Sequence, residues 1–130
     1  MERAIRYSKE VLEHFLRPKN AGVIDDPSGV GMIGDPDCGD SLQLFIRVDG
    51  DRITDVKYLI RGCPAAMAVA SALSELAKGK PVEDALFITD DDVVEALGGL
   101  PEIKLHCSNL GASALQLALK DYYERRISKR

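Results

Sequence analysis

The stretch that decides the fold is Leu42-Gln-Leu-Phe-Ile-Arg-Val48, followed by Asp49-Gly50-Asp51 and a second run from Ile53 to Ile60. The first run alternates well enough for a strand with one buried face. Asp49-Gly50-Asp51 between the runs is a hairpin signal. In the second run, apolar residues at positions 56, 58 and 60 alternate with charged residues at 55 and 57. The sequence therefore predicts an antiparallel sheet that is buried on one side and wet on the other.

An N-terminal helix is predicted within positions 7–17. Ser8 is placed to cap this helix, and Pro18 ends it. His14 lies within the helix, and we expect it to be half exposed, with no partner nearby in the sequence. The turn-rich chain that follows leads to a short strand near residues 30–33. The residues that share the apolar face of the helix are Val11, Leu12, Phe15 and Leu16.

Four further helices are predicted after the hairpin. Residues 64–78 are rich in alanine, so we expect another backbone to pack closely against this helix. A short helix follows at 81–87, and Thr89 caps the next one. The three aspartates after Thr89 suit a helix N-terminus and indicate capping rather than a metal site. The last helix covers residues 108–127. Its apolar stripe is Leu110, Ala114, Leu117 and Ala118, with Leu115, Leu119 and Tyr122 beside it.

Length and charge limit the classes of function. With 130 residues, the chain is expected to form one domain spanning residues 1–130, with a disordered tail from about 128. A net charge of -4 argues against binding to nucleic acid, which favours a basic face. No apolar run approaches the roughly 18 residues of a membrane span. The first residues lack a hydrophobic signal region, so we expect a cytoplasmic protein without a membrane partner.

Three cysteines are the candidate functional residues. Cys38 lies in the loop Gly34-Asp-Pro-Asp-Cys38-Gly-Asp40, Cys63 follows Gly62, and Cys107 follows His106. An odd count does not suit a closed disulfide framework, and a chain without a secretion signal is expected to keep its thiols reduced. Free cysteines are often buried core residues. Each of these three, however, adjoins glycine, proline, aspartate or histidine, which favours one shared metal or cluster site.

The chemistry of such a site follows from its donors. Cys63 and Cys107 each precede a predicted helix, whose N-terminus favours thiolate over thiol. Three thiolates and a fourth donor, either Asp40 or His106, complete a tetrahedral site for zinc or for the iron of a cluster. The chain has no C-x-x-C pair, which excludes a zinc ribbon, a ferredoxin loop and a thioredoxin motif. A cysteine hydrolase is disfavoured because His106 is the sequence neighbour of Cys107.

The motifs closely resemble the IscU/NifU N-terminal scaffold family of iron–sulfur cluster assembly, from about residue 6 to residue 125. The matching residues are Tyr7-Ser8, His14, Pro18, Asn20, Gly22, Gly34-x-x-x-Cys38-Gly39-Asp40, Gly62-Cys63 and Lys104-x-His106-Cys107-Ser108. The resemblance implies an α+β fold, in which about five helices pack on a three-stranded antiparallel sheet and the cluster site lies at one end.

The resemblance also implies a function. Scaffolds of this family are not enzymes. They take persulfide sulfur from a cysteine desulfurase (IscS/NifS-like), combine it with iron, and hold a two-iron, two-sulfur (2Fe-2S) cluster before its transfer to acceptor apoproteins. By this resemblance Cys38, Cys63 and Cys107 are ligands, His106 is a fourth ligand, and Asp40 competes for the metal and keeps the cluster labile. Cys107 is then the favoured persulfide acceptor.

The sequence departs from the family pattern in two places. The chaperone-recognition segment of bacterial IscU reads Leu-Pro-Pro-Val-Lys, whereas this chain has Leu100-Pro101-Glu102-Ile103-Lys104, which argues against handover through the dedicated chaperone. Pro64-Ala65 stands where Gly-Ser is usual. The alternative function is that of the zinc-binding, sulfur-transferring SufU branch, although the insertion of that branch is missing. Zinc in the cluster-free form and a cluster that bridges a homodimer both remain open.

Overall fold

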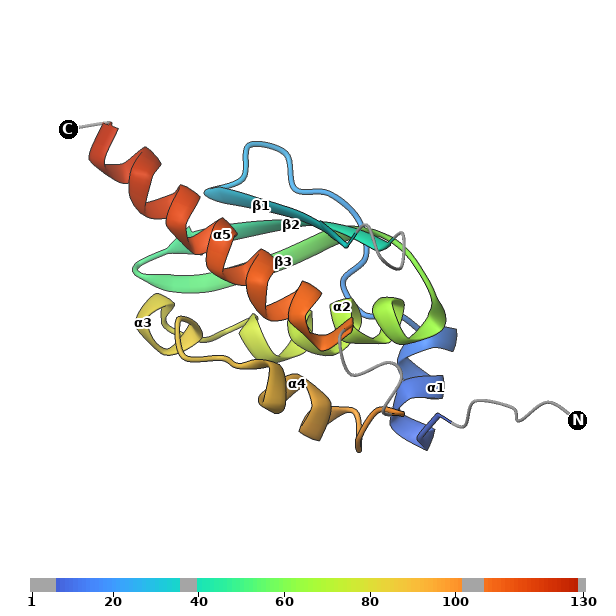
Figure 1. Ribbon diagram of the computed structural model, residues 1–130. Coiled ribbons are helices and arrows are strands. Elements are labelled where there is room, and N and C mark those ends of the chain that lie inside the picture. Colours follow the sequence, from blue (N-terminus) through green and yellow to red (C-terminus); the bar gives the residue numbers. More distant parts are fainter. Residues whose placement is uncertain (1–6, 36–39, 102–106, 129–130) are drawn as a thin grey trace, which may run out of the picture.

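One antiparallel sheet and five helices make up the structure, a computed structural model that describes residues 7–35, 40–101 and 107–128 (Figure 1). The elements are, in chain order, α1 (Lys9–Leu16), β1 (Gly29–Asp35), β2 (Asp40–Asp49), β3 (Arg52–Arg61), α2 (Pro64–Ala77), α3 (Val82–Ala85), α4 (Asp90–Ala96) and α5 (Ser108–Ser128). The strand order is β1-β2-β3, and both pairs are antiparallel. The α+β class with a three-stranded sheet is confirmed.

The predicted hairpin is formed by β2 and β3. Asp49 pairs with Arg52, which leaves Gly50 and Asp51 as a two-residue turn. Both turn residues have positive φ, 59° and 60° respectively. That combination is the primed turn whose twist matches the twist of the flanking strands, and glycine and aspartate are among the residues that tolerate it.

A β-bulge interrupts the hairpin. Arg47 pairs with Asp55 but Val48 pairs with Ile53, so Thr54 is an extra residue in β3. The insertion shifts the alternation of side chains by one position. As a result Ile53 and Val56, which are three positions apart, are both fully buried.

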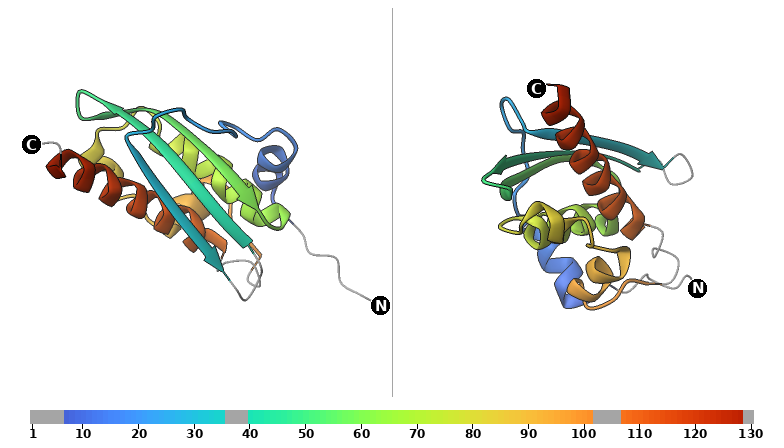
Figure 2. Two further views of the ribbon diagram at one scale, coloured as in Figure 1. Left: turned by 90° about the horizontal axis from the view of Figure 1, so that it is seen from above. Right: turned by 90° about the vertical axis from the view of Figure 1, so that its left-hand side faces the viewer.

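The helices cover one face of the sheet and leave the other open. Figure 2 shows α2 and α5 against the sheet, and α1 and α4 both contact α2 on the side away from it. The open face carries Met32, which is 65% exposed, and Leu59, which is also exposed. The predicted wet side of the sheet is therefore confirmed, although not all of its residues are polar.

The contact between α5 and β1 depends on two glycines. Gly29 and Gly31 point toward α5. A Cβ at Gly31 would lie 2.1 Å from the carbonyl oxygen of Ala114, and one at Gly29 would lie 2.2 Å from that of Ala118. The helix backbone therefore rests directly on the strand backbone. This strand begins at Gly29 and is longer than the expected 30–33.

The alanine-rich α2 is largely buried, and another backbone packs closely against it, as predicted. At Gly111 of α5 a Cβ would lie 3.0 Å from Cγ1 of Val69, so α5 approaches α2 closely at a residue without a side chain. Both helices share the core with the sheet. Its largest fully buried side chains are Tyr58, Leu42, Leu44, Ile46, Ile53, Leu73, Leu97, Leu115, Leu119, Val11, Val56 and Val69.

Some predicted core residues lie at the surface instead. In α1 only Val11 is fully buried, whereas Leu12 is exposed and Leu16 is 72% exposed. The reason is that α1 packs mainly against α2, so that only the side of α1 that faces α2 is covered. In α5, Leu117 is 39% exposed because the helix lies so close to β1 that this side chain is turned to its flank.

The predicted caps are confirmed. Ser8 accepts a hydrogen bond from the Val11 amide, and Thr89 and Asp92 form a reciprocal capping box at the start of α4. The aspartate run therefore serves the helix N-terminus. Burial, and secondarily the charge of Asp91, raises the pKa of Asp90. Among the described residues, no helix is both long enough and apolar enough to cross a bilayer. The expected disordered tail falls largely on residues 129–130, which lie outside the described ranges.

Candidate metal centre

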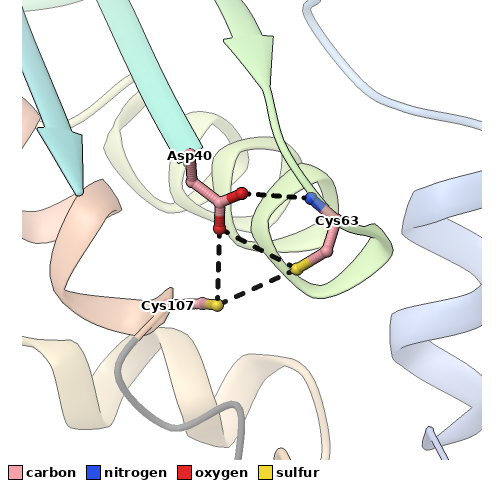
Figure 3. Close-up of side chains that lie close together, drawn as sticks. All are labelled: Asp40, Cys63 and Cys107. Carbon is pink, nitrogen blue, oxygen red and sulfur yellow. Dashed lines mark hydrogen bonds between the residues drawn. The ribbon is translucent and has the colours of Figure 1, made fainter. Parts of the chain in front are cut away.

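Three different elements supply the residues of the centre (Figure 3). Asp40 is the first residue of β2. Cys63 follows the end of β3 and is the N-cap residue of α2. Cys107 comes directly before α5. The start of the central strand and two helix N-termini therefore meet at one end of the molecule, where the resemblance placed the site.

The three side chains face one another. The two sulfur atoms are 4.0 Å apart. The thiols of Cys63 and Cys107 lie 3.9 and 3.8 Å, respectively, from Oδ2 of Asp40. All three ligand atoms lie within 4.8 Å of one another, and neither cysteine is in a disulfide. One small ion could therefore contact all three.

These separations fit tetrahedral coordination. With zinc–sulfur bonds of about 2.3 Å and a tetrahedral angle, two sulfur ligands lie about 3.8 Å apart, and a sulfur and an oxygen ligand about 3.6 Å apart. The observed spacings exceed these values by only a few tenths of an ångström. Two soft thiols and one hard carboxylate suit zinc or the iron of a cluster better than magnesium or calcium.

A backbone hydrogen bond orients the carboxylate of Asp40. Asp40 is only 3% exposed, and its Oδ1 accepts a hydrogen bond of 3.3 Å from the backbone amide of Cys63. This contact leaves Oδ2 pointing between the two sulfurs. Because α2 begins at Pro64, the Cys63 amide that binds this carboxylate lies at the positive end of a helix.

The two described cysteines differ in accessibility. Cys107 has no exposed surface, whereas Cys63 is partly exposed. A reagent or protein from solution therefore meets Cys63 first. Reaction at Cys107 requires the end of the molecule to open.

The structure brings together three of the five predicted site residues. Asp40, Cys63 and Cys107 converge, and Cys38 and His106 lie outside the described residues. His14, the histidine that the structure does describe, contacts Ser71 and Glu75 instead of a thiol. That arrangement gives no support to a cysteine hydrolase. Both partners come from α2 and are distant in the sequence, which agrees with the expectation that His14 has no partner nearby in the sequence.

Sequence reasoning missed one residue, Gly62. A Cβ at this position would lie 2.4 Å from Oδ1 of Asp40. The available signal was a glycine directly before a candidate ligand, which is typical of a close approach to a site.

Comparison with known proteins places the chain in a family. A profile described as NifU-like N terminal domain matches residues 6–129, which is nearly the whole chain. The chain belongs to this family. Together with the convergence of Asp40, Cys63 and Cys107, the match accounts for the order and spacing of the cysteine motifs in this NifU-like domain.

Close relatives of this NifU-like domain come from archaea and bacteria. It is 51% identical over 119 residues to the iron-sulfur cluster assembly scaffold protein IscU 1 of Archaeoglobus fulgidus, covering 92% of this chain and 78% of the relative. It is 48% identical over 121 residues to the scaffold protein IscU of Aquifex aeolicus, covering 92% and 77%.

A solved structure shares the fold of this NifU-like domain. The N-terminal NifU-like protein from Brucella abortus superposes with a TM-score of 0.73, covering 91% of this chain and 94% of that chain. The identity is 17%, so this likeness supports the fold alone.

Proposed function

We propose that this protein is a scaffold, not an enzyme, on which an iron–sulfur cluster is assembled and from which it is transferred to acceptor proteins. The convergence of Asp40, Cys63 and Cys107 from three elements carries the proposal. Relatives that are about half identical over 92% of the chain are named as scaffolds of this kind.

The ligands of the cluster are Cys38, Cys63 and Cys107. Cys38 is two residues before Asp40 in the chain, and His106 adjoins Cys107. His106 and Asp40 are the two candidates for the fourth position. A cluster with three thiolates and one oxygen or imidazole donor is held less firmly than one with four thiolates, which suits a cargo that has to leave.

Asp40 is proposed to control release. A carboxylate is a hard donor beside two soft sulfurs, and its Oδ2 lies within 3.9 Å of both. It can therefore compete with sulfur or imidazole for iron. Because the Cys63 amide holds Oδ1, the carboxylate is already oriented for this role without reorganisation.

Sulfur is proposed to arrive as persulfide from a cysteine desulfurase. The thiolate of Cys107 attacks the terminal sulfur of the donor's Cys–S–SH group, the donor's S–S bond breaks, and the donor leaves as a thiolate while Cys107 becomes Cys–S–SH. Since Cys107 is buried, this transfer requires docking of the desulfurase to open the centre.

The persulfide proposal is tested by single substitutions. We expect Cys107→Ser to abolish persulfide transfer more completely than Cys38→Ser, as measured by intact-protein mass spectrometry after treatment with the desulfurase. Cys63→Ser serves as the matched control from the same centre. Equal loss in the three variants, or full retention in Cys107→Ser, would contradict the assignment of Cys107.

The cluster type and metal are tested by reconstitution without oxygen. We expect iron, cysteine and desulfurase to produce the visible absorption of a 2Fe-2S cluster, with two irons per cluster by elemental analysis. A colourless protein that keeps one zinc would instead support the SufU-like alternative. The same geometry suits zinc in the cluster-free form, so zinc in the protein as purified is compatible with both.

Partners follow from the same proposal. A desulfurase and acceptor apoproteins are required, whereas the change at Leu100-Pro101-Glu102 argues against the dedicated chaperone. Thiols that must stay reduced suit the cytoplasm. Size-exclusion chromatography with light scattering, with and without cluster, distinguishes a cluster held in one chain from one that bridges a homodimer.

A further inference from the structure

A glycine at the rim of the centre is packed against the carboxylate of Asp40. A Cβ placed on Gly62 would lie 2.4 Å from Oδ1 and 2.6 Å from Cγ of Asp40, and 3.0 Å from Cβ of Ala66. The first two distances are far below any ordinary van der Waals contact. A side chain at position 62 and the observed carboxylate position therefore exclude each other.

The two usual reasons for a glycine do not apply here. The φ of Gly62 is outside the left-handed region, so backbone freedom does not require glycine. Gly62 is also exposed, so it is not a position where a core would be overpacked. What remains is the contact with Asp40, together with the milder one with Ala66.

The same oxygen is constrained from two sides. Oδ1 of Asp40 accepts a hydrogen bond from the Cys63 amide, the residue next to Gly62. If Oδ1 were displaced, that bond would break and Oδ2 would leave its place 3.9 and 3.8 Å from the sulfurs of Cys63 and Cys107. Position 62 thus decides whether the carboxylate can take part in the site.

We propose that Gly62 is a positioning residue of the metal centre: its missing side chain makes the room in which Asp40 reaches between Cys63 and Cys107. A larger residue would push the carboxylate out and leave the site without its carboxylate ligand. The inference rests on the proposed function for the identity of the cargo. The steric coupling between Gly62 and Asp40 is a property of this chain and is testable with a single ion.

The test is a double-mutant cycle with Co²⁺ as the probe. The proteins are the parent, Gly62→Ala, Asp40→Ala and the double variant, each reduced and free of oxygen. The measurements are the Co²⁺ dissociation constant, the visible absorption of bound Co²⁺, and the free energy of unfolding without metal. Gly34→Ala is the matched control, because its Cβ would meet only ordinary contacts, the nearest at 3.7 Å from the backbone oxygen of Asp40.

We expect Gly62→Ala to weaken Co²⁺ binding about tenfold or more and to change its spectrum as Asp40→Ala does, because an anionic ligand is lost in both. In the Asp40→Ala background, Gly62→Ala should change the dissociation constant less than about twofold, since the two atoms of Asp40 that it would strike are gone and only the milder contact with Ala66 is left. It should likewise destabilise the parent more than it destabilises Asp40→Ala. Gly34→Ala should resemble the parent throughout.

Equal effects of Gly62→Ala in both backgrounds would overturn the proposal. The glycine would then be needed for its backbone conformation or for its contact with Ala66. If Gly62→Ala fails to fold while the double variant folds, the coupling is shown by folding itself. If neither folds, the proposal is wrong. If the two substitutions are coupled but the protein never assembles a cluster, the proposed function is refuted and this inference stands. If their effects are additive and the protein does assemble a cluster, only this inference is refuted.

Discussion

Gly31 of β1 lies against the backbone of Ala114 in α5, so closely that a Cβ on Gly31 would come within 2.1 Å of the Ala114 carbonyl oxygen. This contact and the equivalent one at Gly29 fix the height of α5 above the sheet. Because Cys107 directly precedes α5, the same contact helps to fix the position of one candidate ligand.

Replacing Gly31 by alanine should therefore destabilise the fold. We expect Gly31→Ala to lower the free energy of unfolding by about 2–3 kcal/mol, because backbone atoms cannot yield as a flexible side chain can. Urea denaturation measures this. Gly34→Ala, on the open face of the same strand, should stay within about 1 kcal/mol of the parent. If the free energy of unfolding falls by a similar amount in both variants, glycine acts through the flexibility of the strand and not through its contact with α5.

Removal of the Asp40 carboxylate should slow the loss of a bound cluster. We expect Asp40→Ala to lengthen the lifetime of the cluster about tenfold, which corresponds to about 1.4 kcal/mol, because a hard oxygen donor and a route for water to the iron are both removed. The decay of visible absorption in air measures the lifetime. A variant that loses its cluster as fast as the parent would remove Asp40 from this role. Lifetime is a rate and Co²⁺ affinity an equilibrium, so the two need not change together.

The difference in burial between the two described thiols predicts different reactivity. We expect iodoacetamide to modify Cys63 at least about tenfold faster than Cys107 in the metal-free protein, because Cys107 reacts only when the end of the molecule opens. Peptide mapping by mass spectrometry separates these two sites from Cys38. The difference between the two labelling rates should disappear in urea. Faster labelling of Cys107 in the native protein would contradict its buried position.

Tyr58 should make stability fall at alkaline pH. Burial raises the pKa of Tyr58 above its ordinary value of about 10; the Glu75 carboxylate raises it further, and the Ser71 hydroxyl lowers it. Since the folded-state pKa is the higher one, this stability is fully present below about pH 10 and is lost as pH rises through the folded-state value. A tenfold difference in proton affinity between the two states corresponds to about 1.4 kcal/mol.

The variant Tyr58→Phe isolates this effect. It keeps the buried ring but cannot ionise, so its free energy of unfolding should fall less than that of the parent between about pH 10 and pH 12. Urea denaturation at a series of pH values measures both proteins, with pH 8 as the reference. Parallel decline of the two curves would show that Tyr58 does not contribute.

Features determined by near neighbours in the sequence were predictable. The turn at Gly50-Asp51, the N-cap at Ser8 and the capping box at Thr89 each depend on residues within a few positions, and all three were confirmed. The type and order of the elements followed from such signals. The convergence of Asp40, Cys63 and Cys107 was also expected, because their chemistry is unusual for a core, and the structure places these three side chains together.

Features that depend on distant partners were not predictable from pattern alone. The sequence placed Gly29 in a turn-rich segment and Gly31 in a short strand, and it gave no sign of their contact with α5, which is at the other end of the chain. Helical spacing put Leu16 and Leu117 in apolar stripes, but spacing does not tell how wide a contact is, and both are exposed. The role of Gly62 likewise depends on Asp40, which belongs to another strand.

The three described members of the metal centre belong to no common segment: Asp40 and Cys63 are 23 positions apart, and Cys63 and Cys107 are 44 apart. An unfolded chain therefore has no comparable binding site, and binding of an ion to this site is thermodynamically linked to the global folding equilibrium. At a free ion concentration of one hundred times the dissociation constant, that linkage adds about 2.7 kcal/mol. Protein with the site occupied should therefore resist heat and proteolysis better than protein with the site empty. Binding and release at the site would then also change the lifetime of the folded protein.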